Sequence, residues 1–298
     1  MSRWSSSYLV AGLRLEIVSS VGDASAYLPR AMREFTAAQA GSADLVISLH
    51  ADEEAQADPL RRFFPSQFTM EAAGEGLSFD GREGKRKHLG FISTACAAAE
   101  MGLPPLDRKF RIAEEEEAVR EAIQAFVRAC LQCRLMKAGG TLMHAAGVAW
   151  EGNGFVFTGH TRAGKTTVSR GFPVEAVLGD DLVAVRESGG TFMLFGTPWP
   201  GREEGTVAYG GVPLRAVFHL HPELEPGLHP QSPGEALAEL AANAPRLGYA
   251  GEESKLLGVF SSLASTVPIY RVSLRLGDDA MPYLRQFSVK EGGGDKID

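Results

Sequence analysis

A glycine-rich loop with one lysine, near the middle of the chain, carries the clearest chemistry in this sequence. Residues 154–171 read GFVFTGHTRAGKTTVSRG and contain Gly159-x-x-x-x-Gly164-Lys165-Thr166, the pattern of a Walker A phosphate-binding loop. In such loops backbone N–H groups surround the α- and β-phosphates, the lysine reaches the β/γ oxygens and the hydroxyl ligates Mg²⁺. The pattern predicts a bound nucleoside triphosphate. The residues predicted to contact it are Gly159, His160, Thr161, Arg162, Ala163, Gly164, Lys165, Thr166 and Thr167.

The sequence on either side of the loop supplies the elements that such a site requires. Residues 155–157 form a short apolar run typical of a strand, and residues 167–170 can begin a helix. Strand, loop and helix in this order are the context in which the motif binds phosphate. The alternative is a glycine-rich turn with an incidental lysine, and this context argues against it.

Two adjacent acids follow the next strand-like run. Asp180 and Asp181 come after the apolar residues 176–178, and Asp181 lies only sixteen positions beyond Lys165. That spacing leaves room for one short helix and one strand, so we expect the acids at the end of the strand next to the phosphate loop. There they can organise Mg²⁺ and accept the proton of an attacking hydroxyl. Without the upstream lysine, a solvated turn would be the better interpretation.

Three segments in register resemble a known family. Residues 142–149, 159–166 and 177–183 are similar to the catalytic core of HPr serine kinase/phosphorylase and its relatives. The resemblance covers roughly residues 140–200 and implies an α/β fold. That fold has a P-loop kinase core of the HPr kinase/phosphoenolpyruvate carboxykinase type, with a mixed sheet and hairpins, beside a small N-terminal α+β domain.

The resemblance also implies a role for individual residues. Lys165 would bind the β/γ-phosphates and Thr166 would hold Mg²⁺, with Asp180 supporting the metal. Asp181 would be the general base toward a hydroxyl, and the general acid if phosphate is removed. His144 matches a family histidine near the transferred phosphate, although a lone histidine on a strand is more often a hydrogen-bonded core residue.

The chain departs from HPr kinase in ways that bear on its acceptor. The family's second signature is not recognisable, which leaves Glu203 and Glu204 as the candidates for a second metal ligand. Neither the N-terminal part nor the C-terminus resembles that of HPr kinase, so HPr is not the expected acceptor. Looser relatives phosphorylate other acceptors, including ribosomal peptides at a serine. Arg162 and Arg202 can neutralise phosphate charge, or they are ordinary surface arginines.

The function expected from the resemblance is an ATP- and Mg²⁺-dependent kinase that phosphorylates a hydroxyl, such as a serine of a small protein or peptide. Two alternatives remain open at this point. One is a kinase of the same fold that acts on a small metabolite, and the other is a nucleotide-gated peptide-binding module without turnover. HPr kinases are oligomeric, so the resemblance also leaves a homo-oligomer open.

The composition narrows the choice of partners. The 298 residues carry a net charge of −7, which argues against nucleic acid and anionic membranes as main partners. No run approaches the about 20 apolar residues that span a bilayer, and no secretory signal is recognisable at the start. Three cysteines fit a reducing compartment. We therefore expect a cytoplasmic protein.

The remaining pattern predicts domains 1–112 and 113–290, followed by a flexible tail at 291–298. The first domain, which could recognise an acceptor or be structural support, shows strands near 12–18 and 45–50, a hairpin at 71–81 and helices at 24–38 and 94–101. A long amphipathic helix begins at residue 114 and ends before Gly139, with Cys130 and Cys133 expected as buried small side chains and not as half of a zinc site. Further on we expect hairpins at 142–158 and 182–195, strands at 214–220 and 268–276, and helices at 233–244 and 252–264.

Overall fold

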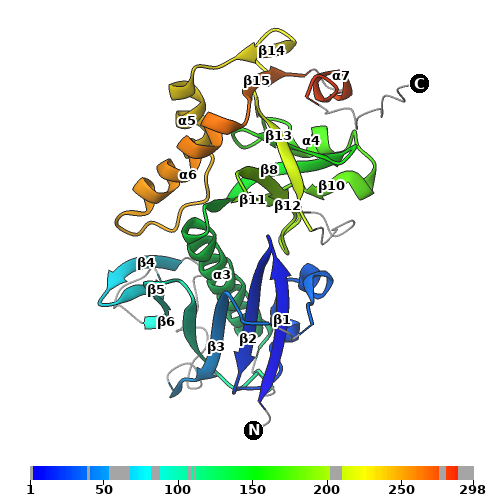
Figure 1. Cartoon of the computed structure of the whole chain (residues 1–298). Helices are drawn as coiled ribbons and strands as arrows, with labels where there is room; N and C mark the ends of the chain where they lie inside the picture. The colour runs from blue at the N-terminus through cyan, green and yellow to red at the C-terminus, as the bar shows by residue number, and fades with distance from the viewer. Residues whose placement is uncertain are drawn as a thin grey trace, which may run out of the picture. The chain divides into compact units, whose positions relative to one another are not determined.

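The computed structural model describes residues 3–38, 41–53, 68–81, 88–106, 109–110, 112–201, 210–274 and 280–287. The chain divides into two compact units. Unit 1 comprises Met1–Leu142 and Pro245–Val259, and unit 2 comprises Met143–Ala244 and Phe260–Asp298. Both contain a mixed sheet with few helices, so the predicted α/β class is confirmed (Figure 1).

A seven-stranded sheet forms the centre of unit 1, in the order β1-β2-β3-β7-β6-β5-β4. β2 and β7 both run parallel to β3, and the other neighbours are antiparallel. Alternate residues of β2 and β3 are buried, as expected for strands with one face on a core. The strands are β1 (Trp4–Val10), β2 (Leu13–Ser19), β3 (Leu45–Ala51), β4 (Phe68–Ala73), β5 (Gly76–Gly81), β6 (His88–Ser93) and β7 (Ala98–Leu103).

The long helix α3 (Ala113–Lys137) packs on this sheet (Figure 1). Its apolar stripe includes Ile123 and Phe126, both fully buried, and the Phe126 ring meets the edge of Phe79 with 5.1 Å between ring centroids. Gly90 on β6 makes room for that ring, because an added Cβ would lie 2.8 Å from it. Acids in the first turn and Arg134 and Lys137 in the last suit the helix dipole.

The division of the chain therefore differs from the predicted boundary at residues 112/113. α3 belongs to unit 1, because its apolar stripe is buried by the first sheet and not by the sheet that follows it. The periodicity of a helix shows that it has a buried face, but not which sheet covers that face. Cys130 and Cys133 are buried within α3, as predicted. Residues 291–298, predicted as a tail, lie outside the described residues.

The predictions of two helices in unit 1 were wrong. Residues 24–38 contain only the short 3₁₀ helices η1 (Ser25–Tyr27) and η2 (Arg30–Phe35). Residues 94–101 turn into strand β7, which pairs with β3 on one edge and β6 on the other. Pairing on both edges outweighs the helix propensity of this alanine-rich stretch, because strand formation depends on tertiary context.

The sheet of unit 2 has eight strands, in the order β10-β8-β11-β12-β13-β15-β14, with β9 paired to both β8 and β13. The hairpins β8–β9 and β11–β12 are antiparallel, as predicted, whereas β9 and β15 both run parallel to β13. The strands are β8 (Gly140–Trp150), β9 (Asn153–Thr158), β10 (Val177–Gly179), β11 (Leu182–Ser188), β12 (Thr191–Phe195), β13 (Val212–Leu220), β14 (Gly227–Pro230) and β15 (Ile269–Ser273). The helices are α4 (Lys165–Ser169), η3 (Val174–Ala176), α5 (Pro233–Ala242), α6 (Glu252–Thr266) and α7 (Met281–Leu284).

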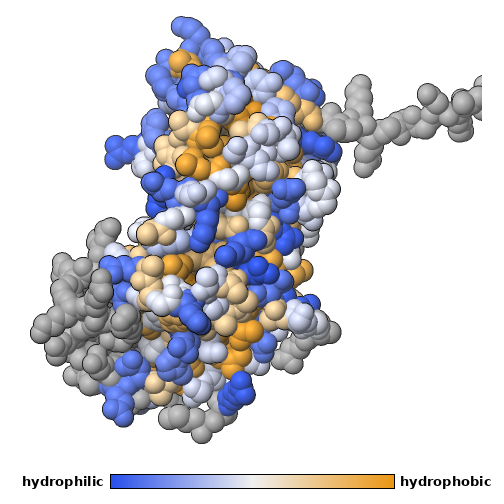
Figure 2. Space-filling model, turned by 60° about the vertical axis from the view of Figure 1, so that its left-hand side comes forward, coloured by the Kyte–Doolittle hydropathy of each residue, from blue (hydrophilic) through white to orange (hydrophobic). Residues whose placement is uncertain are grey.

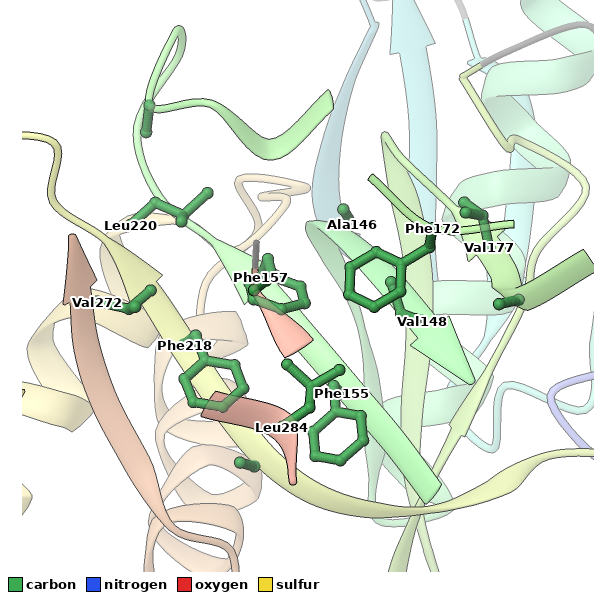
Figure 3. Packing of buried hydrophobic residues seen from close by; sticks show 14 residues of the cluster. Ala146, Val148, Phe155, Phe157, Phe172, Val177, Phe218, Leu220, Val272 and Leu284 are labelled. Atoms are coloured by element: carbon green, nitrogen blue, oxygen red, sulfur yellow. The ribbon is translucent and has the colours of Figure 1, made fainter. Parts of the chain in front are cut away.

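An aromatic core lies next to the predicted phosphate loop (residues 159–167) of unit 2 (Figure 3). Phe155 and Phe157 on β9 stack on Phe218 of β13, with centroid distances of 6.4 and 5.1 Å. The same cluster includes Ala163 of the loop and Phe172 beyond α4. Both ends of the loop are thus fixed to a packed core, which favours a fixed loop conformation.

The face of the protein seen in Figure 2 is neither uniformly hydrophobic nor uniformly hydrophilic. In Figure 2, hydrophilic residues are interspersed with smaller hydrophobic areas. Among the described residues, no helix combines the length and the apolar character needed to cross a membrane.

Candidate functional site

The phosphate loop connects β9 to α4 and depends on two glycines. Gly159 has φ 151° and Gly164 has φ 106°, values that side-chain-bearing residues rarely adopt. A Cβ on Gly159 would lie 3.0 Å from the Ala163 Cβ and 3.1 Å from the Leu220 carbonyl oxygen, so the site has little room for one. Arg162 also has a positive φ of 70°, and its side chain is exposed. The sequence motif thus corresponds to a loop whose backbone requires its glycines.

Lys165 lies at the start of α4 and turns back into the loop. Its Nζ donates to the carbonyl oxygens of Gly159, at 2.9 Å, and His160, at 3.2 Å. Burial lowers the pKa of the Lys165 ammonium below its usual value, and the nearby Asp181 carboxylate partly opposes that shift. Lys165 is therefore a desolvated cation whose hydrogen bonds are to neutral carbonyls, and it lies within electrostatic range of Asp181.

His144 and Asp181 form the second part of the site. The His144 Nε2 lies 3.1 Å from the Asp181 Oδ1, and both side chains are about half exposed, at 47% and 58%. The backbone holds this pair in place as well, since the Ala145 N–H donates to the Asp181 carbonyl at 3.1 Å. One carboxylate oxygen of Asp181 thus contacts the imidazole, and the exposed side chain can be approached from solvent.

The two adjacent acids occupy different environments. Asp180 is 6% exposed, whereas the Asp181 side chain, in the same bend between β10 and β11, is 58% exposed. The Asp180 N–H donates to the Pro200 carbonyl at 2.9 Å, and a Cβ on Gly201 would come within 2.3 Å of the Asp180 Oδ1. The 200–201 turn therefore packs against Asp180. Of the two acids, Asp181 is the one whose side chain is accessible from solvent.

Contrary to the sequence prediction, the strand that precedes the two acids does not lie next to the strand that enters the loop. β10, which precedes them, pairs with β8 and not with β9, so β8 separates it from the strand that enters the loop. The hairpin partner β8 and the parallel partner β13 occupy both edges of β9. Because β8 lies between β9 and β10, its residue His144 lies between the loop and Asp181. The Thr158 hydroxyl donates to the His144 carbonyl at 3.3 Å.

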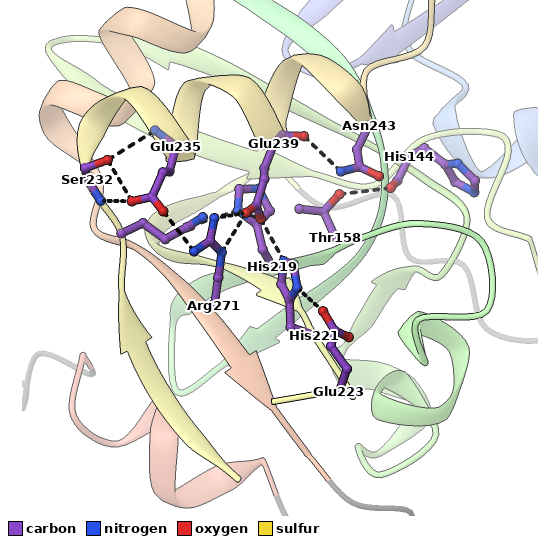
Figure 4. A network of polar contacts seen from close by, with 11 residues as sticks. His144, Thr158, His219, His221, Glu223, Ser232, Glu235, Glu239, Asn243 and Arg271 are labelled. Atoms are coloured by element: carbon purple, nitrogen blue, oxygen red, sulfur yellow. Dashed lines mark hydrogen bonds and ion pairs between the residues drawn. The ribbon is translucent and has the colours of Figure 1, made fainter. Parts of the chain in front are cut away.

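A polar network at the end of β13 was missed by the sequence interpretation. β13 runs parallel to β9 with His219 in register with Thr158, so the residues after it lie beside the phosphate loop. Glu239 of α5 joins the network through its Oε2, which lies 2.9 Å from the His219 Nδ1 and 3.0 Å from the His221 Nε2. Figure 4 shows these contacts together with the labelled partners of Glu239. The only available signal was the His-x-His pattern, which has meaning only once β13 is known to flank β9.

Charge pairing dominates this network. Burial alone would raise the pKa of the Glu239 carboxyl, but hydrogen bonds from His219, His221 and Arg271 outweigh it and hold that pKa far below its usual value. Burial would likewise lower the pKa of His221, yet its hydrogen bonds to Glu239 and Glu223 raise it. The His221 Nδ1 lies 2.6 Å from Glu223, and the Arg271 Nη1 lies 3.0 Å from Glu235.

The residues present fit a magnesium ion that is shared with a nucleotide. Among the described residues, no group of three or more His, Cys, Asp or Glu side chains is arranged to hold a metal alone. Mg²⁺ commonly takes one or two protein oxygens and completes its shell with phosphates and water. Thr166 is exposed at the start of α4, and Asp180 carries a carboxylate of the hard oxygen type that Mg²⁺ prefers. Arg202, Glu203 and Glu204 lie outside the described residues.

Comparison with known proteins gives no independent identification. No protein-family model and no curated protein matches this chain.

Proposed function

We propose that this protein is an ATP- and Mg²⁺-dependent kinase that transfers the γ-phosphoryl group to a hydroxyl, of which a serine in a small protein or peptide is the first candidate. The observation that carries the proposal is the meeting of three groups from separate elements. Lys165 of α4, Asp181 after β10 and His144 of β8 come from separate elements but lie together at the loop. These residues also lie in the three segments that resemble the HPr kinase-like family.

The arrangement supports direct phosphoryl transfer by positioning and charge neutralisation. Lys165 would leave the Gly159 and His160 carbonyls and bind the β/γ oxygens, which offer it charged partners. The acceptor oxygen would form its bond to the γ-phosphorus as the bond to the β–γ bridging oxygen breaks, which leaves ADP. The acceptor proton would pass to the free oxygen of Asp181 while His144 holds the other.

Magnesium would neutralise charge on the transferred phosphoryl group. Thr166 and Asp180 are the residues that the resemblance assigns to it. Asp180 is held by the turn at Pro200, so it would define one wall of the metal site without moving. Asp181 faces solvent and remains available to the acceptor.

An acceptor of some size is consistent with the exposure of the site. His144 and Asp181 are both about half exposed, so the side that an acceptor would approach is open. A serine on a peptide or protein can reach such a position, whereas kinases for small metabolites commonly enclose their substrates. We therefore place a macromolecular acceptor before a metabolite.

Transfer from labelled ATP separates these possibilities. The protein would be incubated with γ-labelled ATP, Mg²⁺ and a cell lysate, followed by phosphoamino acid analysis of labelled macromolecules and chromatography of small products. Label on serine in a peptide or protein, lost in Lys165→Ala, is the expected result. Label in a soluble metabolite would assign the activity to a metabolite kinase. ATP binding with no labelled product in any fraction would contradict a kinase and favour the nucleotide-gated binding module.

A further inference from the structure

Unit 1 contains a cavity that the proposed chemistry does not use. It measures about 670 Å³, a size typical of ligand pockets. Trp4, Ser6 and Tyr8, alternate residues of β1 that share one face of the strand, form one side, and Met32 of η2 faces them. The Tyr8 side chain is buried and bonds to the Ser6 hydroxyl, and burial raises the pKa of the Tyr8 phenol. The cavity thus combines aromatic surface with fixed hydroxyl groups.

Three arginines line the cavity, and they differ in how they are paired. The Arg33 Nε lies 3.1 Å from the Glu34 carboxylate. Arg120 of α3 contacts Glu116 at 2.9 Å and also bonds to a backbone carbonyl. The Arg30 side chain makes no hydrogen bond or ion pair with any residue that the structure describes. An unpaired guanidinium at a cavity with aromatic walls favours a carboxylate-bearing ligand.

The cavity lies along the outer edge of the sheet. β1 is the terminal strand, and its hairpin register with β2 directs the N–H and C=O groups of Ser5 away from β2. Further along, Ser7 already accepts a hydrogen bond from the Ala37 N–H at 2.9 Å, which shows that this edge can pair with another segment. Ser5 has no such partner among the described residues.

We propose that this cavity binds an extended peptide with an acidic side chain, through Arg30 and the free edge of β1 at Ser5. The carboxylate pairs with Arg30, a neighbouring apolar side chain packs between Trp4 and Met32, and the peptide backbone bonds to Ser5. The Arg30 side chain is exposed, so a ligand carboxylate can reach it from solvent. If the peptide is the phosphate acceptor, the cavity is its docking site, and that part of the inference rests on the proposed function. Peptide binding itself requires neither nucleotide nor catalysis.

Fluorescence anisotropy without nucleotide tests the site. The probes are a pool of fluorescein-labelled nonapeptides with glutamate fixed at the centre, and a matched pool with lysine there. The wild type should bind the glutamate pool about five-fold more tightly than the lysine pool. Arg30→Glu should reverse that preference, whereas Arg285→Glu, an exposed arginine of unit 2, should leave it unchanged. Ser5→Pro should weaken binding more than Ser5→Ala, because only proline removes the outward N–H.

Equal binding of the two pools, or a preference that survives in Arg30→Glu, would overturn the inference. Competition by free glutarate as effective as by the unlabelled glutamate pool would overturn the assignment to a peptide. Lys165→Ala should keep peptide binding and lose nucleotide binding, so failure of the kinase proposal is distinguishable from failure of the docking site. Thermal unfolding of each variant checks that the exposed substitutions leave the fold intact.

Discussion

Two polar clusters flank β9 in unit 2, and they differ in whether their charged side chains have charged hydrogen-bonding partners. The phosphate-loop cluster (residues 159–167 with His144 and Asp181) has positive-φ backbone, half-exposed acid and imidazole, and a desolvated lysine bonded to neutral carbonyls. The β13 network (His219, His221, Glu223, Glu235, Glu239 and Arg271) is centred on Glu239, which is 20% exposed and contacts two histidines and an arginine.

We propose that this difference distinguishes a ligand site at the loop from a network that stabilises the fold. Charge left without a charged hydrogen-bonding partner is characteristic of groups that act on something else. A carboxylate satisfied by two histidines and an arginine has little left to offer a substrate. The network is close enough to the loop to be mistaken for part of the site, so substitutions that separate rate from stability are the way to test this contrast.

The largest effect is expected at Lys165. Lys165→Ala should reduce phosphoryl transfer about 10³-fold, because no other described cation reaches the loop from α4. The free energy of unfolding should change little, since the lost hydrogen bonds join a charged group to two carbonyls. Lys137→Ala, at the exposed end of α3, is the matched control. Initial rates with labelled ATP provide the measurement, and a variant that keeps its rate would remove the loop from the mechanism.

Asp181 should be the next most sensitive position. Asp181→Asn preserves the shape and the contact with His144 but removes the base, so transfer should fall about 10²- to 10³-fold. ATP should still bind, because Lys165 and the loop glycines are untouched. Single-turnover rates beside nucleotide affinities measure the two effects separately. Full transfer by this variant would mean that another group accepts the proton.

A change in the β13 network should affect stability instead. Glu239→Gln would leave the His219, His221 and Arg271 groups without their shared carboxylate and should lower the free energy of unfolding by about 2–4 kcal/mol. Below its unfolding temperature, the variant should transfer phosphate at a rate within about three-fold of the wild type. Urea unfolding and rate assays on the same preparation test both parts. A stable but inactive variant would place the network in the active site.

The smallest expected effect concerns pH. Because the folded state raises the pKa of His221 above its usual value of 6.5, its contribution to stability is complete below that value. It is lost as the pH rises through the higher folded-state pKa. The stability difference between the wild type and His221→Gln should therefore be larger in mildly acidic than in alkaline buffer. Urea unfolding across this range measures it, and a difference that grows with pH would contradict the charge pairing.

Local features of the fold could be predicted from the sequence, but the pairing of distant segments could not. The turn at 151–154 and the apolar runs around it predicted the β8–β9 hairpin, and the periodicity of α3 predicted its length. In contrast, the placement of β13 beside β9 and the strand at Ala98–Leu103 depend on neighbours far away in the sequence. Pairing of this kind leaves no local periodicity.

The candidate site shows the same limit. Lys165 and Asp181 were predictable because the loop motif and the spacing of the acids are local patterns. His144 required a family resemblance, since its contact with Asp181 exists only because β8 lies between β9 and β10. His219 and His221 have no local signal of their own and became recognisable only in the folded sheet.

Isothermal titration calorimetry of ATP with Mg²⁺ tests the central claim most directly. The wild type should show saturable heat with one site per chain, Lys165→Ala should show none, and Asp181→Asn should bind like the wild type. No heat in the wild type, or the same heat in Lys165→Ala, would contradict a nucleotide site at this loop.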